Sequence, residues 1–147
     1  MTKTHHGLSL AYGGVVVDGQ GRVLLREPKN HFDGYAYTFA KGRPDEGETP
    51  EEAALREVRE ETGLEAEIVE PIPGTFAGGT TSNAYFLMRP VRDHGDFDRA
   101  ETESVSWMDW GEAEARIRQT TNSKGRARDL AVLVAALAVW RSQPPHH

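Results

Sequence analysis

Cysteine is absent from this 147-residue chain. Its absence excludes disulfides, thiolate metal sites and cysteine nucleophiles, and it fits a reducing compartment, so we expect a cytoplasmic location. Long apolar runs are absent as well. The longest, Leu130–Trp140, has 11 residues, whereas a membrane-spanning helix needs about 20. The N-terminal segment 1–6 lacks the apolar centre of a signal peptide. We therefore predict neither a membrane span nor a secretory leader.

Basic residues are in the minority, with 17 Lys and Arg against 23 Asp and Glu and a formal net charge of -6. This balance argues against general nucleic-acid binding, because such proteins are usually basic. An acidic protein that binds phosphates would do so through a metal ion or a few local cations. The length fits one domain, and no internal repeat divides it. We expect a single domain over 1–147 with loose ends at about 1–6 and 142–147, which include paired histidines.

The alternation of apolar and turn-forming residues predicts the order β-β-β-α-β-β-β-α-α. Strands are expected over 8–18, 22–26, 35–40, 65–72, 83–89 and 104–108, and helices over 50–62, about 109–118 and 126–141. The first two strands are expected to form a hairpin across the turn at residues 18–21. This mixture of hairpins with one long crossover indicates an α+β domain with a mixed sheet between helices.

The helix expected over 50–62 carries clear signals at both ends. Thr49 is a typical N-cap residue, Pro50 occupies the first helical position, and Glu52 stands at the capping-box spacing. Gly63 is suited to end the helix in the left-handed conformation. The sequence therefore fixes both ends of this helix.

An acidic cluster lies within the same helix, where Glu57, Glu60 and Glu61 have the spacing i, i+3 and i+4. Residues at this spacing fan over one helix face. Three neighbouring carboxylates are unfavourable without a cation, and hard oxygen ligands suit Mg²⁺ or Mn²⁺. The alternative is a solvated helix face, because Arg56 and Arg59 alternate with the acids.

These residues belong to a longer pattern. Gly42, Glu48 and the segment 56–64 (REVREETGL) resemble, without a mismatch, the Nudix box of the Nudix hydrolases. The resemblance is expected to extend over residues 7–141. It implies a Nudix-type α/β/α sandwich and a metal-dependent enzyme. Such an enzyme hydrolyses a pyrophosphate bond in a nucleoside diphosphate linked to another moiety. We expect a small nucleotide as its partner, a nucleoside (poly)phosphate above all.

The resemblance also implies roles for individual residues. Glu57, Glu60 and Glu61 are expected to bind Mg²⁺, with Mn²⁺ as an alternative, and the Gly42 carbonyl often completes the metal ligands in this family. Glu48 and Arg56 are expected to form an orienting pair. The residues expected to take part in catalysis are Glu60, Glu61, Arg56 and Glu103.

The general base is the least determined of these roles. In some family members it is a Glu of the box, and in others it is a Glu on a later loop before the last strand. In this chain that later region contains Glu101 and Glu103, of which we favour Glu103. Asp96 and Asp98 are competing candidates nearby.

Substrate contacts are expected around Gly42 and on the later strands. Lys41 and Arg43 flank Gly42 and could bind phosphate oxygens. Tyr85 could stack on a base, although aromatic residues on strands more often lie in a core. Markers of the ADP-ribose, dinucleoside polyphosphate and coenzyme A subfamilies are not found, so the substrate stays open.

Two alternative functions fit the sequence less well. A non-catalytic nucleotide sensor on the same fold would be expected to lose box carboxylates, and this chain keeps them. An isoprenyl diphosphate isomerase on this fold needs a catalytic cysteine. The Ala-rich closing helix over 126–141 is expected to pack in the core, with a homodimer interface as the alternative.

Overall fold

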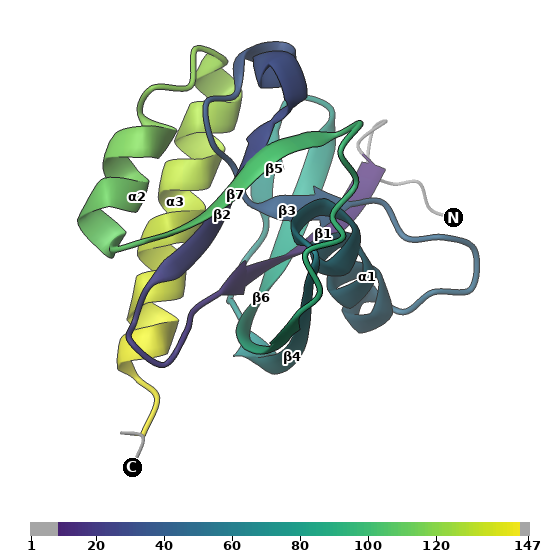
Figure 1. Ribbon diagram of the computed structural model, residues 1–147, viewed down its shortest axis with the longest axis vertical. Coiled ribbons are helices and arrows are strands. Elements are labelled where there is room, and N and C mark those ends of the chain that lie inside the picture. Colours follow the sequence, from purple (N-terminus) through teal and green to yellow (C-terminus); the bar gives the residue numbers. More distant parts are fainter. Residues whose placement is uncertain (1–8, 145–147) are drawn as a thin grey trace.

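The computed structural model describes residues 9–144, and helices lie on both sides of its strands (Figure 1). The strands are β1 (Ser9–Val16), β2 (Val23–Pro28), β3 (Ala40–Gly42), β4 (Leu64–Pro71), β5 (Phe76–Gly78), β6 (Thr81–Asp93) and β7 (Thr102–Met108). The helices are α1 (Pro50–Thr62), α2 (Trp110–Ile117) and α3 (Ser123–Arg141), and a 3₁₀ segment, η1, covers Lys29–Gly34. The predicted α+β class with a mixed sheet between helices is confirmed. No helix in this part of the chain has the length and apolarity to cross a bilayer.

The main sheet has the order β3-β1-β6-β4, and β5 also pairs with β6. Strand β1 runs parallel to β6 and antiparallel to β3. It lies inside the sheet with both faces covered, and its residues Val15 and Val16 are fully buried. A continuous apolar run is typical of such a strand.

The hairpin predicted for the first two strands is wrong. The turn itself forms, since Asp18 N donates to the Arg22 carbonyl at 3.0 Å, but only one bridge, Val17 to Val23, joins the two segments. β2 pairs instead with β7 in a separate two-stranded sheet. The reason is that β6 takes one edge of β1 along its whole length, and β3 takes part of the other.

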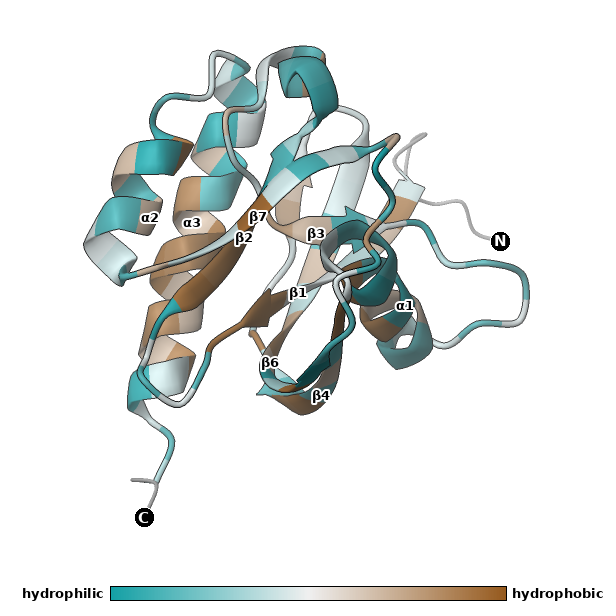
Figure 2. Ribbon diagram, in the orientation of Figure 1, coloured by the Kyte–Doolittle hydropathy of each residue, from teal (hydrophilic) through white to brown (hydrophobic). Residues whose placement is uncertain are grey.

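Side-chain alternation along the strands divides the core in two. Val15, Leu25 and Leu87 point to the side covered by α2 and α3, whereas Val16 and Met88 point to the side covered by α1. Figure 2 shows the apolar residues concentrated along β2 and α3. The strands thus carry two apolar faces, and each face is closed by helices.

Helix α1 has the bounds and caps predicted for it. The Thr49 side chain accepts from Glu52 N at 3.1 Å, and the Glu52 side chain accepts from Thr49 N at 3.0 Å. Gly63 ends the helix with φ 75°, in the left-handed region. The capping box and the glycine together place the acidic cluster on the last two turns of a well-defined helix.

Replacing Gly63 by Ala is expected to lower the free energy of unfolding by about 1–2 kcal/mol or more. The left-handed backbone disfavours a Cβ, and a Cβ here would also lie 2.9 Å from the Asp96 backbone nitrogen. Chemical denaturation measures the loss. Gly19 serves as the control, because a Cβ there meets nothing within 4 Å. Equal stability of the two variants would contradict the strain at residue 63.

Other boundaries differ from the predicted ones. Strand β5 forms between the segments 65–72 and 83–89, where no strand is predicted. Helix α3 begins at Ser123, ahead of the expected residue 126, because the Asn122 side chain accepts from Gly125 N at 3.0 Å and caps the helix. Most of the predicted loose ends, with their histidines, lie outside the described residues. Within the described part, Gln143 donates to the Glu70 carboxylate at 2.9 Å.

Candidate active site

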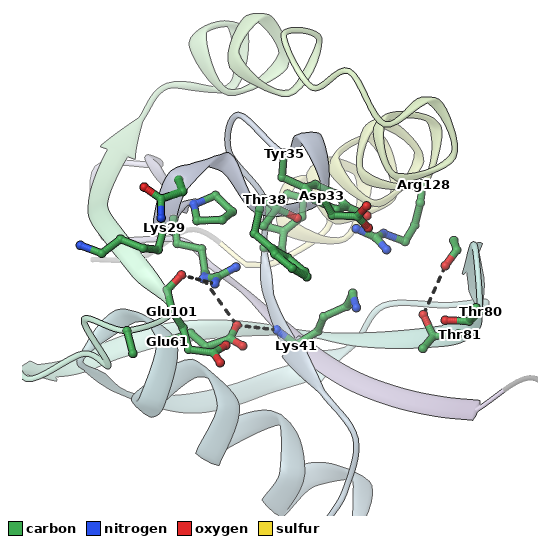
Figure 3. A pocket seen from close by; sticks show the side chains of 17 residues that line it. Lys29, Asp33, Tyr35, Thr38, Lys41, Glu61, Thr80, Thr81, Glu101 and Arg128 are labelled. Carbon is green, nitrogen blue, oxygen red and sulfur yellow. Dashed lines mark hydrogen bonds and ion pairs between the residues drawn. The ribbon is translucent and has the colours of Figure 1, made fainter.

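A cavity of about 580 Å³ opens between the two sheets and the N-terminal part of α3. Its walls come from β2, η1, β3, β5 and α3, and the last turn of α1 contributes Glu61 (Figure 3). This volume is typical of a pocket for a small molecule. Four basic side chains line it: Arg26, Lys29, Lys41 and Arg128. Three acidic residues line it too, Asp33, Glu61 and Glu101, so the cavity offers charges of both signs to a ligand.

Glu61 is the carboxylate of α1 that reaches the cavity. It accepts from Lys41 N at 3.1 Å, and Arg26 Nε lies 3.7 Å from it. Burial raises the pKa of Glu61 to about 8, and the positive charge of Arg26 opposes that rise. The nearby positive charges of the protein therefore do not fully offset the cost of burying this carboxylate in its ionised form.

Glu57 and Glu60 both contact Arg56. Arg56 Nη1 lies 3.0 Å from Glu57 and 3.2 Å from Glu60. Burial raises the pKa of Glu57, and the charge of Arg56 opposes it. Among residues 9–144, no three His, Asp or Glu side chains are grouped so as to share one ion. A cation at α1 would therefore have to replace Arg56 contacts at Glu57 and Glu60.

The backbone of β3 runs directly against this acidic cluster. A Cβ at Gly42 would overlap the Glu57 carboxylate, so any other residue would displace that side chain. The absence of a side chain leaves the backbone of residue 42 close to the carboxylate oxygens. The donor set of this region, carboxylates and a peptide group, is the kind that Mg²⁺ and Mn²⁺ prefer. The residues present therefore fit such an ion.

Arg56 also fixes the loop before the helix. Its Nε lies 2.7 Å from Glu48 Oε2, and its Nη2 donates to Glu48 Oε1 at 2.9 Å, the two-point geometry of an arginine–carboxylate pair. Nη2 also donates to the Arg43 carbonyl at 3.1 Å. The Arg56 guanidinium lowers the pKa of Glu48. The loop over 43–48 is thereby tied to the helix that carries the acids.

The candidate bases occupy different places. Glu101 lines the cavity, whereas Glu103 is not a lining residue and pairs at 3.0 Å with Lys29, which is one. Asp96 pairs with Arg59 at 2.6 Å, away from the cavity wall. Asp98 accepts from Ala100 N at 2.9 Å and shapes the loop. Of the four candidates, Glu101 lines the cavity, and Glu103 contacts a lining residue.

The three expected substrate contacts are not all brought to the cavity. Lys41 lines it, and burial lowers the pKa of this lysine. Arg43 is exposed and is not among the lining residues. Tyr85 is only 1% exposed and packs edge-on against Phe39 and Phe76 in the core. The expected base contact at Tyr85 does not fit this placement, because β6 turns its ring between the sheet and α3.

Sequence reasoning missed a buried charged pair on α3. Arg128 is 4% exposed and Asp129 is fully buried, with Arg128 Nε 3.0 Å from Asp129 Oδ1. Thr38 Oγ1 donates to Asp129 Oδ2 at 2.6 Å. A signal did exist in the sequence. Residues 128 and 129 lie at helical spacing from the buried positions 125, 132, 136 and 139, so they fall on the same buried face of the helix.

Comparison with known proteins gives one family. The model of the NUDIX domain matches residues 7–130. An RNA pyrophosphohydrolase of Novosphingobium aromaticivorans is 44% identical over 57 residues, which are 39% of this chain and 35% of that protein. A MutT-like protein of Streptomyces ambofaciens is 33% identical over 78% of this chain and 71% of its own length. A solved UDP-X diphosphatase has a TM-score of 0.68 at 14% identity, covering 96% of this chain and 68% of its own. The chain belongs to the Nudix hydrolase family.

Proposed function

We propose that this protein is a metal-dependent pyrophosphohydrolase of a nucleoside (poly)phosphate. The observation that carries the proposal is that a carboxylate of the acidic helix and several basic side chains line the same cavity. The half-buried Glu61 of α1 lines a cavity to which four basic side chains also contribute. A divalent cation and an anionic substrate together complement this distribution of charge. The names of the RNA pyrophosphohydrolase and the UDP-X diphosphatase agree with this class of reaction.

Glu57, Glu60 and Glu61, with the Gly42 carbonyl, would hold Mg²⁺, or Mn²⁺ in its place. Such an ion, when bound, neutralises phosphate oxygens and lowers the pKa of a bound water. Such an ion would take over the contacts that Arg56 makes with Glu57 and Glu60, while Arg56 would still tie down the loop through Glu48. The positive charge at the cavity then binds and orients the phosphate chain.

A carboxylate close to the cavity would accept the proton of the attacking water. We assign this role to Glu103, with Glu101 as the competing candidate. Lys29 holds the Glu103 carboxylate at 3.0 Å and so restricts its position. Replacing Glu103 by Gln is expected to lower kcat by about a hundredfold, a typical contribution of general base catalysis, with little change in KM. The pH profile of kcat measures the role. If E103Q keeps the wild-type kcat and the wild-type fall of kcat at low pH, the base would instead be Glu101.

A hydrolysis panel tests the proposed function. It covers nucleoside di- and triphosphates, dinucleoside polyphosphates, nucleotide sugars and ADP-ribose, each with Mg²⁺ and with Mn²⁺, and resolves the products by chromatography. We expect one preferred compound, cleaved at a pyrophosphate bond. If a nucleotide binds tightly with Mg²⁺ and stays intact across the panel, the enzyme assignment fails and a sensor is favoured.

Location and assembly are separate proposals. The absence of cysteine supports a cytoplasmic location.

The Ala-rich α3 supports a homodimer, since it buries one face in the core and leaves Val134 70% exposed on the other. Light scattering over a range of protein concentrations tests the dimer, and a constant monomer mass would contradict it.

A further inference from the structure

We propose that Arg128 is a specificity-determining residue that binds a phosphate group of the substrate beyond the bond to be cleaved. This inference rests on the proposed function and narrows its substrate class to nucleoside triphosphates and longer polyphosphates. The phosphate would lie between Arg128 of α3 and Lys41 of β3. Figure 3 shows these two side chains pointing into the cavity from different elements.

The position of the guanidinium is fixed from behind. Arg128 Nε donates to Asp129 at 3.0 Å, and Thr38 holds the other oxygen of the same carboxylate at 2.6 Å. Asp129 is completely buried, so it contacts no ligand itself. Its role is to orient Arg128, as a buried carboxylate orients a ligand-binding group. The Arg128 side chain therefore needs no reordering when a ligand binds.

Two further contacts fix the plane of the guanidinium. Its central carbon lies 5.4 Å from the centre of the Tyr35 ring. On β5, a Cβ at Gly78 would lie 2.6 Å from Arg128 Nη1, so the guanidinium packs directly on the backbone there. With Asp129, Tyr35 and Gly78 around its guanidinium, Arg128 is only 4% exposed and yet forms part of the cavity wall.

The charges around the guanidinium point to an anion. In the described part of the chain, Asp129 is the only acid that forms an ion pair with Arg128, and Lys41 forms none. The guanidinium lies against Gly78 and Tyr35 and also lines the cavity, where the planar fork of an arginine matches phosphate oxygens. The two cations face the same cavity without a carboxylate pairing to Lys41, so a phosphate between them would relieve their repulsion.

The Lys41 backbone connects this phosphate site to the acidic helix. Lys41 N donates to Glu61 at 3.1 Å, while its side chain extends toward Arg128. A phosphate bound by the Lys41 ammonium and Arg128 would thus be adjacent to the phosphates addressed from Glu61. A nucleoside triphosphate has such an additional phosphate, whereas a nucleoside diphosphate lacks it.

Arg128→Gln tests the proposal through kcat and KM for a nucleoside diphosphate, triphosphate and tetraphosphate of the same base with Mg²⁺. For the two longer substrates we expect KM to rise about tenfold or more, the size of one or two charge-assisted hydrogen bonds, with kcat nearly unchanged. For the diphosphate we expect less than a twofold change. Arg141→Gln is the matched control, because Arg141 lies at the exposed end of the same helix and loses the same charge.

Several outcomes would overturn the inference. KM values unchanged in R128Q, or raised equally for all three substrates, would show that Arg128 serves only to pair with the buried Asp129. A changed preference among bases at constant phosphate number would show that it contacts the base. If R128Q does not fold, Arg128→Lys keeps the charge without the fork. R128K should also raise KM for the triphosphate and tetraphosphate and leave KM for the diphosphate nearly unchanged. Wild-type KM values in R128K would show that the planar guanidinium does not bind the phosphate.

A binding measurement separates this inference from the proposed function. Calorimetry with inorganic tripolyphosphate and Mg²⁺ should show binding to the wild type that is weakened about tenfold in R128Q and is retained in R141Q. That result without any hydrolysis would overturn the proposed function and support the phosphate site. Hydrolysis by the wild type with equal tripolyphosphate binding in R128Q would overturn the phosphate site alone.

Discussion

Replacing Glu61 by Gln is expected to lower metal-supported turnover by about a hundredfold or more, because a metal ligand supplies several kcal/mol of transition-state stabilisation. Glu61 is the α1 carboxylate at the cavity, and its substitution removes a negative charge while keeping the hydrogen bond from Lys41 N possible. The matched control is Glu51→Gln, which removes the same charge from the exposed first turn of the same helix. Its turnover should equal that of the wild type.

Thermal unfolding provides a second measurement on the same variant. A ligand that binds only the folded state raises its stability. Mg²⁺ should therefore raise the Tm of the wild type and of E51Q, and should raise that of E61Q much less. Without divalent ions, E61Q should be at least as stable as the wild type, because a buried carboxylate is costly to desolvate. Wild-type turnover in E61Q together with a normal Mg²⁺ response would remove Glu61 from the metal site.

Replacing Gly42 by Ala is expected to lower kcat by about tenfold to a hundredfold, the range seen when a metal ligand loses its supporting contacts. The added Cβ would overlap the Glu57 carboxylate, so either Glu57 or the β3 backbone must move. Either movement changes how the β3 backbone and the Glu57 carboxylate lie relative to each other. Steady-state kinetics with varied Mg²⁺ measure the effect, and we expect a higher Mg²⁺ requirement as well.

The control for this variant is Gly47→Asn in the same loop. Gly47 has φ 83°, and a Cβ there meets nothing within 4 Å. Asn tolerates this backbone conformation better than most residues. We therefore expect nearly unchanged kinetics for G47N. If G42A kept the kinetics and the Mg²⁺ requirement of the wild type, the close approach of β3 to α1 would have no functional importance.

Local signals predicted α1 well, and the structure confirms the helix over residues 50–62 with both caps. Each signal acts within one turn of the helix. Thr49 and Glu52 bond to each other, and Gly63 needs only its own backbone conformation. Such interactions depend on residues close in the sequence, so the sequence specifies them without knowledge of the fold.

The partner of β2 could not be predicted in the same way. The turn at Asp18 indicated a hairpin, and the local turn does form. The choice of pairing partner depends on which edges of β1 remain free, and β3 and β6 take them. Competition between strands far apart in the sequence leaves no signature in the residues of either strand.

The cavity shows the same limit. Lys41 was expected because it adjoins Gly42, whereas Arg128 came to light only when α3 was placed against β5 and Thr38. A charged pair within a helix usually indicates a solvated face. Asp129 reverses this rule because a threonine hydroxyl and an arginine satisfy its carboxylate inside the protein.

The pairing of β2 with β7 also affects how the chain folds. Arg26 on β2 bonds to Thr102 on β7, 76 residues away, and β1 pairs in parallel with the similarly distant β6. Domains dominated by such non-local pairs fold slowly, in about milliseconds to seconds. During synthesis β2 emerges long before its partner, and an unpaired strand edge invites association with other chains. The arrangement that builds the cavity thus makes the growing chain dependent on its last third.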